Sequence, residues 1–409
     1  MGSYRVEEIA EGVWLLRVND RMTQYFESLW EIPEGITYNA YLIDTGEGSI
    51  LVDGWKHTFS ASLIEALESL TGPDRLRYVV VNHLEPDHSG SLEDVLRWAP
   101  RARVVGSRMA ARILAGSYPR ARERFQPVRD GDSLRLGWAT LRFYSTPWVH
   151  WPETMVTWLE ERGILFTCDA FGGFGIPEGV FDDECARETD IMRSMKKYLV
   201  TVVGHYRKFI TKALDKLEKE GVKPRIIAPG HGLLWRGDPG RVMSYYKSLA
   251  HAEPQKGKIL ALYASMYGTL EQLSRALACE LRKKGYKPIV YGFTDTTRPN
   301  ISDILTDAID AEKIIIAAPT YEAGVFPYMK FIAEELCHKA AAEKDVYVLS
   351  TYGWGGIAGK KLREILESCG FRVRSVIEEQ AIAPREGLGI IDKIRALVAQ
   401  LEEVVLGEG

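Results

Sequence analysis

The hydrophobic residues of the first 250 positions fall into short runs that are separated by turn-forming residues. The clearest runs are SILVDG, RYVVVN, ARVVGS, TLRFYS, ILFTCD and RIIAPG. They are rich in β-branched and aromatic residues and end in Gly, Asn, Asp or Ser, which is typical of strands followed by turns. Some helical stretches lie between them. This half of the chain is therefore predicted to be a layered domain that consists largely of β-strands.

The second half alternates buried strands with amphipathic helices. The predicted strands are KILALYAS, KPIVYGF, KIIIAAPT, DVYVLSTY and FRVRSVI, and helical stretches such as LEQLSRALACELRKKG follow them, with a closing helix at the end. This alternation predicts a doubly wound parallel sheet. The polar segment HAEPQKGK, residues 251–258, separates the two patterns. We expect one domain over residues 1–252 and a second over residues 256–409.

Composition limits the classes of function. With 409 residues, of which 46% are hydrophobic, the chain can bury more than one core. The net charge is only -4, and acidic and basic residues are interleaved, so no nucleic-acid or membrane partner is indicated. The N-terminal sequence MGSYRVEEIAEGVWLL does not read as a signal peptide, and no apolar run has the length of a membrane span. We expect a cytoplasmic protein that acts on small substrates.

The five cysteines are far apart in the sequence and form no CxxC pair: Cys168, Cys185, Cys279, Cys337 and Cys369. This spacing argues against a disulfide framework, a cysteine-ligated zinc site and a built-in rubredoxin. We expect inert thiols. If the protein transfers electrons, it has to receive them from another molecule.

The segment NHLEPDHSG, residues 82–90, places two imidazoles and two carboxylates directly after an apolar strand. Pro86 is expected to exclude a helix at this point, so that the chain stays extended. In an extended chain His83, Glu85 and Asp87 share one side and can converge on one point. The segment is a candidate metal site.

The residues after this segment predict the start of a helix. Ser91 followed by Asp94 and an apolar run resembles a capping box at the beginning of SLEDVLRWA. His88 is therefore expected just ahead of a helix N-terminus.

Further potential metal ligands also follow apolar runs: His150, Asp169 and His231. Ligands at the same edge of a layered sheet can meet in space although they are far apart in sequence. Four imidazoles and three carboxylates are too many for one tetrahedral ion, but they suit two ions that share a bridging carboxylate. These ligand types alone leave iron and zinc equally plausible.

The pattern HxExDH, continued by the three later ligands, resembles the flavodiiron proteins, also called A-type flavoproteins. Their N-terminal domain has the metallo-β-lactamase αββα fold, in which the zinc hydrolases mostly carry HxHxDH; here Glu85 replaces the middle imidazole. The resemblance implies no catalytic side chain beyond the metal ligands. It implies one iron held by His83, Glu85 and His150, a second held by Asp87, His88 and His231, and Asp169 as the bridge.

The loops of the second half are candidates for a flavin site. SMYGTLEQL follows the first strand and opens a helix, where backbone N–H groups and hydroxyls can hold a phosphate. The loops APTYEAGVFP and STYGWGGIAG follow the third and fourth strands, and Tyr321 and Trp354 could cover the faces of a flat ring. This set of loops resembles flavodoxin and implies FMN, although Leu270 stands where a second Thr or Ser is common.

The residues expected to bind FMN come from all three loops. They are Ser265, Met266, Tyr267, Gly268, Thr269, Pro319, Thr320, Tyr321, Glu322, Ala323, Gly324, Thr351, Tyr352, Gly353, Trp354 and Gly355.

The family resemblance covers essentially the whole chain and implies a function. It implies an oxidoreductase that reduces dioxygen to water, nitric oxide to nitrous oxide, or both, at a non-haem diiron site. The electrons would come through FMN from rubredoxin, a reductase or a reduced deazaflavin. The resemblance also implies a head-to-tail homodimer or a dimer of dimers.

Two alternatives stay open. A zinc hydrolase with an attached flavodoxin domain explains the ligands but leaves Glu85 and the flavin without a role. A redox sensor that is not an enzyme could use the same cofactors, although the chain shows no DNA-binding segment.

Other residues that could form a site are expected to be structural. The remaining histidines have no partner at a recognisable spacing and are expected on the surface or packed: His57, His205, His251 and His338. Tyr25 and Phe26 could line a substrate pocket, but core packing is the favoured interpretation.

Overall fold

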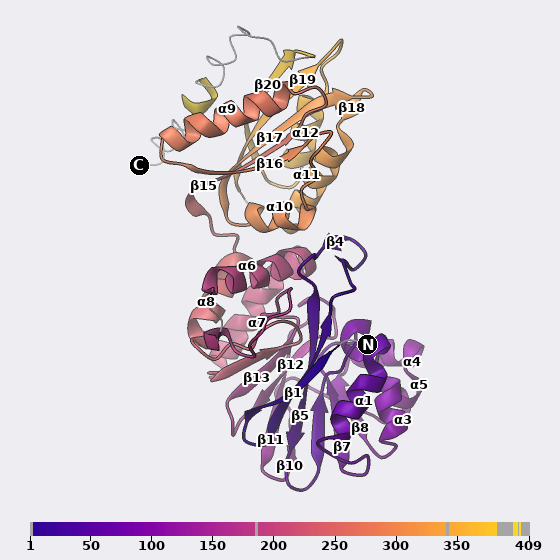
Figure 1. The fold of residues 1–409 in the computed structure, drawn as a ribbon. Helices are drawn as coiled ribbons and strands as arrows, with labels where there is room; N and C mark the ends of the chain where they lie inside the picture. The colour runs from indigo at the N-terminus through magenta and orange to yellow at the C-terminus, as the bar shows by residue number, and fades with distance from the viewer. Residues whose placement is uncertain (1–2, 185–186, 341–342, 383–395, 400, 402–409) are drawn as a thin grey trace. The chain divides into compact units, whose positions relative to one another are not determined.

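The computed structural model describes residues 3–184, 187–340, 343–382, 396–399 and 401. The chain divides into two compact units, Met1–His251 and Ala252–Gly409 (Figure 1). Within the described ranges, no helix has both the length and the apolar character that crossing a membrane requires.

Two β-sheets form the centre of the first unit (Figure 1). The first sheet has the order β1-β2-β5-β6-β7-β8-β9, and its strands are β1 (Tyr4–Ala10), β2 (Val13–Asp20), β5 (Ile36–Asp44), β6 (Ser49–Val52), β7 (Leu76–Val81), β8 (Arg103–Ser107) and β9 (Phe125–Val128). The second sheet has the order β10-β11-β12-β13-β14, and its strands are β10 (Ser133–Leu136), β11 (Ala139–Ser145), β12 (Met155–Leu159), β13 (Ile164–Cys168) and β14 (Ile226–Pro229).

Helices cover the outer face of each sheet. Those beside the first sheet are α1 (Ser60–Glu68), α3 (Leu92–Trp98), α4 (Ala110–Ser117) and α5 (Pro119–Glu123). Those beside the second sheet are α6 (Glu188–Tyr198), α7 (Arg207–Lys219) and α8 (Pro239–Ala250), and a π-helical segment, η3 (Leu199–Val203), follows α6 directly. The order helices, sheet, sheet, helices is the αββα sandwich that the family resemblance implies.

The remaining elements of the first unit are short. They are the hairpin β3 (Tyr25–Phe26) and β4 (Trp30–Glu31), the helix α2 (Pro86–Ser89), and the 3₁₀ turns η1 (His57–Phe59), η2 (Asp182–Glu184) and η4 (Gly204–Tyr206).

The hydrophobic core of the first unit lies between the two sheets. Leu15, Ile43 and Val52 from the first sheet pack with Phe143 and Phe166 from the second, and all five side chains are buried. Because alternate residues of a strand point to opposite faces, each sheet contributes one apolar face to this core and turns the other toward the helices. The core fixes both sheets against each other and thereby fixes the strand ends from which the functional side chains extend.

The second unit contains a six-stranded sheet. Five parallel strands have the order β16-β15-β17-β19-β20, and β18 pairs with β17 in the antiparallel sense. The strands are β15 (Gln255–Ala264), β16 (Lys287–Phe293), β17 (Ala311–Tyr321), β18 (Gly324–Val325), β19 (Asp345–Tyr352) and β20 (Arg372–Gln380). This is the flavodoxin order 2-1-3-4-5, with the topological switch point between β15 and β17. The predicted doubly wound sheet is confirmed.

The helices of the second unit alternate with its strands. They are α9 (Thr269–Lys283), α10 (Ile301–Ala308), α11 (Pro327–Lys339) and α12 (Ala358–Glu367). Leu277 and Leu281 of α9 pack with Leu397 and Leu401 near the C-terminus. Most of the closing helix that the sequence predicts lies outside the described residues.

The cysteines correct one prediction. Cys337 in α11 and Cys369 just after α12 form a disulfide, although no disulfide framework was expected. Sequence spacing could not show this pair, because the packing of α11 against α12 brings their carboxyl ends together. Cys168 and Cys279 are free, and Cys185 lies outside the described residues.

Removing this bond should destabilise the second unit. The two cysteines are 32 residues apart in the sequence. Without the cross-link the unfolded chain gains conformational entropy, which lowers the free energy of unfolding by about 3 to 4 kcal/mol. Cys337→Ser is expected to lower the unfolding midpoint under oxidising conditions, as followed by urea denaturation. Reductant should lower the midpoint of the parent protein and leave that of Cys337→Ser unchanged; equal parent midpoints with and without reductant would contradict the assignment.

Candidate metal centre and cofactor cavity

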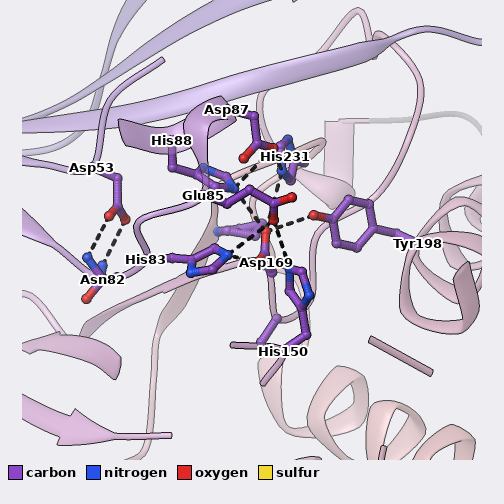
Figure 2. Close-up of polar contacts among 12 residues, drawn as sticks. Asp53, Asn82, His83, Glu85, Asp87, His88, His150, Asp169, Tyr198 and His231 are labelled. Atoms are coloured by element: carbon purple, nitrogen blue, oxygen red, sulfur yellow. Dashed lines mark hydrogen bonds and ion pairs between the residues drawn. The ribbon is translucent and has the colours of Figure 1, made fainter. Parts of the chain in front are cut away.

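The predicted metal ligands of the first unit extend from the carboxyl ends of strands. His83 follows β7, Asp169 directly follows β13, and His231 comes two residues after β14. His150 lies in the connection between β11 and β12. All four side chains are buried. The sandwich therefore collects these side chains at one edge, as the sequence predicts (Figure 2).

The loop after β7 differs from its prediction. Pro86 starts the short helix α2 instead of keeping the chain extended, and Asp87 and His88 lie within that helix. Glu85 is the extended residue that precedes it. Proline is well tolerated at the first helical position, because the N–H group that it lacks has no intrahelical partner there. As a result, Asp87 points to a different part of the site from His83 and Glu85.

The predicted capping box at Ser91 is also wrong. Its side chain caps no N–H group of α3; instead, the Ser91 hydroxyl accepts a hydrogen bond from the Trp55 backbone N–H at 3.0 Å. Ser91 therefore ties the ligand-bearing segment to the end of β6.

The first group of ligand atoms surrounds one point. Glu85 Oε2 lies 3.2 Å from His83 Nε2 and 2.9 Å from His150 Nε2. Asp169 Oδ2 lies 3.4 Å from His83 Nε2 and 3.3 Å from His150 Nε2. Two imidazoles, one carboxylate oxygen and one oxygen of Asp169 thus face each other.

The second group has the same composition. Asp169 Oδ1 lies 2.9 Å from His88 Nε2 and 3.6 Å from His231 Nε2. Asp87 Oδ2 lies 3.5 Å from His88 Nε2 and 3.3 Å from His231 Nε2. The two oxygens of Asp169 therefore belong to different groups, and this carboxylate stands between them (Figure 2).

These separations fit metal ions. Ligand atoms about 2.1 Å from a first-row metal ion are about 3.0 Å apart in an octahedron and about 3.4 Å apart in a tetrahedron. Both oxygens of Asp87, Oδ2 of Asp169 and Nε2 of His231 are buried, yet they form no hydrogen bond with any described residue. Buried polar atoms are rarely left without a partner, so these atoms are suited to hold a cation in each group.

The charges of the cluster also favour positively charged partners. Burial would lower the pKa of His83, but Asp169, Glu153 and Glu85 together raise it well above its usual value. The same competition between burial and neighbouring carboxylates raises the pKa of His150 to about 9. In Glu85, burial is outweighed by hydrogen bonds from two imidazoles, which lower its pKa to about 2. The carboxylates thus draw positive charge to the ring nitrogens, and metal ions would supply that charge.

Several residues that the sequence interpretation missed hold the ligands in place. His83 Nδ1 lies 2.8 Å from Glu153 Oε1, and His231 Nδ1 donates to the Thr37 carbonyl at 2.7 Å. The Tyr198 hydroxyl donates to Asp169 Oδ1 at 2.8 Å. No spacing marks these residues in the sequence. The PETM segment at Glu153 lies close to His150, and that proximity is the only signal that could have suggested it.

A buried carboxylate supports the start of the ligand loop. Asp53 accepts hydrogen bonds from the Asn82 backbone N–H at 2.7 Å and from its side-chain amide at 2.9 Å (Figure 2). The Asn82 side-chain oxygen accepts a hydrogen bond from the Thr157 hydroxyl of β12. Because Asn82 precedes His83, this network fixes where the loop leaves β7.

The structure shows where the two aromatic residues of the predicted pocket and the four remaining histidines lie. Phe26 is buried, and its ring centre lies 6.0 Å from that of His231, whereas Tyr25 is exposed. Phe26 therefore packs against the ligand cluster. The histidines that were expected to be structural are all exposed: His57, His205, His251 and His338.

The second unit contains a cavity of about 700 Å³ at the carboxyl ends of its strands. All of the residues predicted to bind FMN line it except Gly268 and Gly324. Further lining residues lie at its sides: Leu270, Gly356, Ile357, Ala381 and Ile382. Leu270 fills the position where a hydroxyl was noted as missing. The cavity is at the switch point of the sheet, where doubly wound proteins bind nucleotides.

One end of the cavity fits a phosphate. Gly268 has a φ of 89° and precedes α9, a conformation that residues with a side chain rarely adopt. The next residue, Thr269, is buried, and its hydroxyl forms no hydrogen bond with any described residue. A helix N-terminus, with its free N–H groups and positive dipole end, favours an anion there.

The aromatic residues of the cavity lie at its rim. Trp354 is 97% exposed and Tyr321 is 38% exposed, although both line the cavity. The Thr320 hydroxyl accepts hydrogen bonds from the N–H groups of Ile357 and Ala358, so it positions the start of α12.

Comparison with known proteins places both units in families. Residues 36–232 match the family described as ODP family beta lactamase, and residues 262–390 match the family described as flavodoxin. The chain is 30% identical to the nitric oxide reductase of Moorella thermoacetica over 361 residues, which are 88% of this chain and 89% of that protein. The chain belongs to the flavodiiron protein family.

Two further similar proteins agree with this family. The rubredoxin-oxygen oxidoreductase of Megalodesulfovibrio gigas is 28% identical over 89% of this chain and 90% of its own length. The solved structure of a mutant flavo di-iron protein from Thermotoga maritima superposes with a TM-score of 0.90 at 36% identity, covering 98% of this chain and 99% of that chain. The similarity spans both units, so the flavodiiron fold accounts for the metal centre and the cavity together.

Asp169→Ala should cause the loss of metal from both groups of this flavodiiron protein, since each group then lacks one oxygen. We expect a larger decrease than the about 10- to 100-fold loss of metal affinity that follows the removal of an outer hydrogen bond. Iron and flavin would be measured per purified chain. Tyr198→Phe is the matched control, because it removes a hydrogen bond to Asp169 but keeps the carboxylate. Equal iron content in Asp169→Ala and the parent protein would remove Asp169 from the centre.

Gly268→Val should weaken flavin binding. A β-branched residue at this φ costs about 1 to 3 kcal/mol, which corresponds to about a 5- to 150-fold loss of affinity if the loop relaxes away from the cavity. Flavin fluorescence titration of the flavin-free protein measures this change. Gly285→Val, at another positive φ outside the cavity, is the control for general strain. An unchanged flavin affinity in Gly268→Val would show that the cofactor lies elsewhere.

Proposed function

We propose that this flavodiiron oxidoreductase reduces dioxygen to water, nitric oxide to nitrous oxide, or both. The observation that carries the proposal is Asp169, whose two oxygens face two separate groups of ligand atoms. One iron is assigned to His83, Glu85 and His150, and a second to Asp87, His88 and His231, with Asp169 as the bridge.

The electron count agrees with these substrates. Dioxygen takes up four electrons and four protons to form two waters, and two nitric oxide molecules take up two electrons and two protons to form nitrous oxide and one water. Two ferrous ions together with one reduced flavin supply four electrons. The two relatives with these activities in their names support the choice of substrate.

The chain's own residues position and shield the centre. Asp169 and the imidazoles are buried, so bulk water has little access to them. The Tyr198 hydroxyl donates a hydrogen bond to Asp169, and Glu153 is hydrogen-bonded to His83. Phe26 packs against His231. In nitric oxide reduction, two irons would hold two substrate molecules side by side, and this proximity would favour the formation of the N–N bond.

The second unit supplies the flavin. FMN would be held in this cavity: Gly268 and Thr269 would hold its phosphate, and the loops that carry Tyr321 and Trp354 would hold its ring. No CxxC pair of a rubredoxin occurs in the sequence, so we expect an external electron donor: rubredoxin, a reductase or a reduced deazaflavin. The relative named rubredoxin-oxygen oxidoreductase supports the first of these.

We further propose the assembly and location of the protein. Residues 1–252 form the metal domain and residues 256–409 the flavin domain. A head-to-tail homodimer, or a dimer of dimers, would place the flavin of one chain near the metal pair of another. The cytoplasm is the proposed location, since the expected electron donors are reduced there.

The alternatives are less well supported. A zinc hydrolase gives no role to the cavity of the second unit or to Glu85, which lies among the first group of ligand atoms. A sensor would bind the same cofactors without turnover, and nothing in the relatives' names favours it.

Metal analysis combined with anaerobic turnover tests the function. We expect two irons and one FMN per chain, and consumption of dioxygen or nitric oxide by the photoreduced protein, recorded with a gas electrode. Protein freed of iron with a chelator should keep its FMN and lose turnover, and added ferrous ion should restore it. Stoichiometric zinc would favour the hydrolase, and two irons without turnover would favour the sensor.

A further inference from the structure

The imidazoles of the two ligand groups differ in the hydrogen-bond partner of Nδ1, the ring nitrogen that faces away from the other ligand atoms. His83 Nδ1 faces a carboxylate, Glu153 Oε1, at 2.8 Å. His231 Nδ1 donates to a neutral carbonyl, that of Thr37, at 2.7 Å. The Nδ1 atom of His88 is buried and has no hydrogen-bond partner within the described part of the chain. The first group therefore has a carboxylate hydrogen-bonded to a ligand imidazole, which neither His88 nor His231 has. The buried carboxylate of Asp53, which interacts with His88, accepts its hydrogen bonds from Asn82 instead.

We propose that Glu153 is a positioning residue that fixes the His83 ring and, through its charge, makes the iron of the His83 group the more easily oxidised of the two. This inference rests on the proposed function, because it requires two irons in the assigned positions.

The hydrogen bonds of Glu153 determine which His83 nitrogen carries the proton. Glu153 Oε1 also accepts a hydrogen bond from the Leu84 backbone N–H at 3.0 Å, so this oxygen acts as an acceptor. His83 Nδ1 is therefore the donor to it. The lone pair of His83 Nε2 is then left for the side of Glu85 and Asp169, which is the side of the metal.

Glu153 is held firmly in this position. Its side chain is buried, and its backbone carbonyl accepts a hydrogen bond from the Ser107 hydroxyl at the end of β8 at 2.6 Å. Its second oxygen, Oε2, forms no hydrogen bond with a described residue, and its ion pair among the described residues is with His83. Among the described residues, the Leu84 N–H and the His83 imidazole are the groups that compensate the Glu153 carboxylate, so its charge acts mainly on His83.

The consequence is electronic. A carboxylate that accepts the imidazole N–H makes the ring a stronger donor to a metal, whereas a peptide carbonyl does this less. A stronger donor favours the higher oxidation state. The His83 side is therefore expected to be oxidised first and reduced last, although both groups contain two imidazoles and one carboxylate of their own.

Two substitutions separate position from charge. Glu153→Gln keeps an oxygen that can accept from His83 and Leu84 but removes the charge, whereas Glu153→Leu removes both. Glu160→Gln, at a partly exposed ion pair with Arg142 just beyond β12, is the control. For each protein, iron content is measured, and the mixed-valent iron signal is followed by electron paramagnetic resonance during a redox titration with FMN bound.

Glu153→Gln should keep two irons. The lower of the two iron reduction potentials should rise, because the negative charge near His83 is gone. The two potentials then lie closer together, so the mixed-valent signal should appear over a narrower range of applied potential. Glu153→Leu should lose iron from one position, with affinity about 10- to 100-fold weaker. Glu160→Gln should match the parent protein.

The failures are distinguishable. A parent protein without two irons overturns the proposed function and, with it, this inference. A two-iron parent whose potentials are unchanged in Glu153→Gln overturns the inference alone. If Glu153→Leu does not fold, Glu153→Gln still decides the role of the charge.

Discussion

The position of the Asp169 carboxylate between the two groups of possible ligand atoms is the constraint on which the proposed centre depends. A single buried carboxylate directs one oxygen to His83 and His150 and the other to His88 and His231, and a tyrosine hydroxyl holds the second oxygen. Burying three carboxylates and four imidazoles together without cations is costly, because their charges and lone pairs lack partners. The sandwich tolerates the cluster because the strand ends are fixed by a large apolar core. The apolar core thus offsets the cost of burying the charged cluster that the proposed function requires.

The sequence allowed the ligand set to be predicted because chemistry and position coincide there. Asp169 comes directly after an apolar run, and His150 and His231 come a few residues after one; such runs are the most reliable signal of a strand. The doubly wound order of the second unit was equally accessible, since its strands and helices alternate regularly. The FMN residues follow from the same rule, because loops after parallel strands meet at one edge.

The remaining features depend on tertiary contacts that no spacing reveals. Strand β5 is not among the runs named from the sequence. Its buried Asn39 accepts a hydrogen bond from Arg17 and donates one to the Pro229 carbonyl at the end of β14. The helix at Pro86 and the role of Ser91 were decided by packing against neighbouring segments. Glu153, Tyr198 and the disulfide likewise join residues far apart in the sequence, so only the fold shows them.

The most direct test of the account is anomalous diffraction at the iron edge from crystals of the protein grown without oxygen. The account predicts two iron peaks, one on each side of the Asp169 carboxylate, with His83 and His150 at one peak and His88 and His231 at the other. A single peak, or two peaks that do not share Asp169, would contradict it.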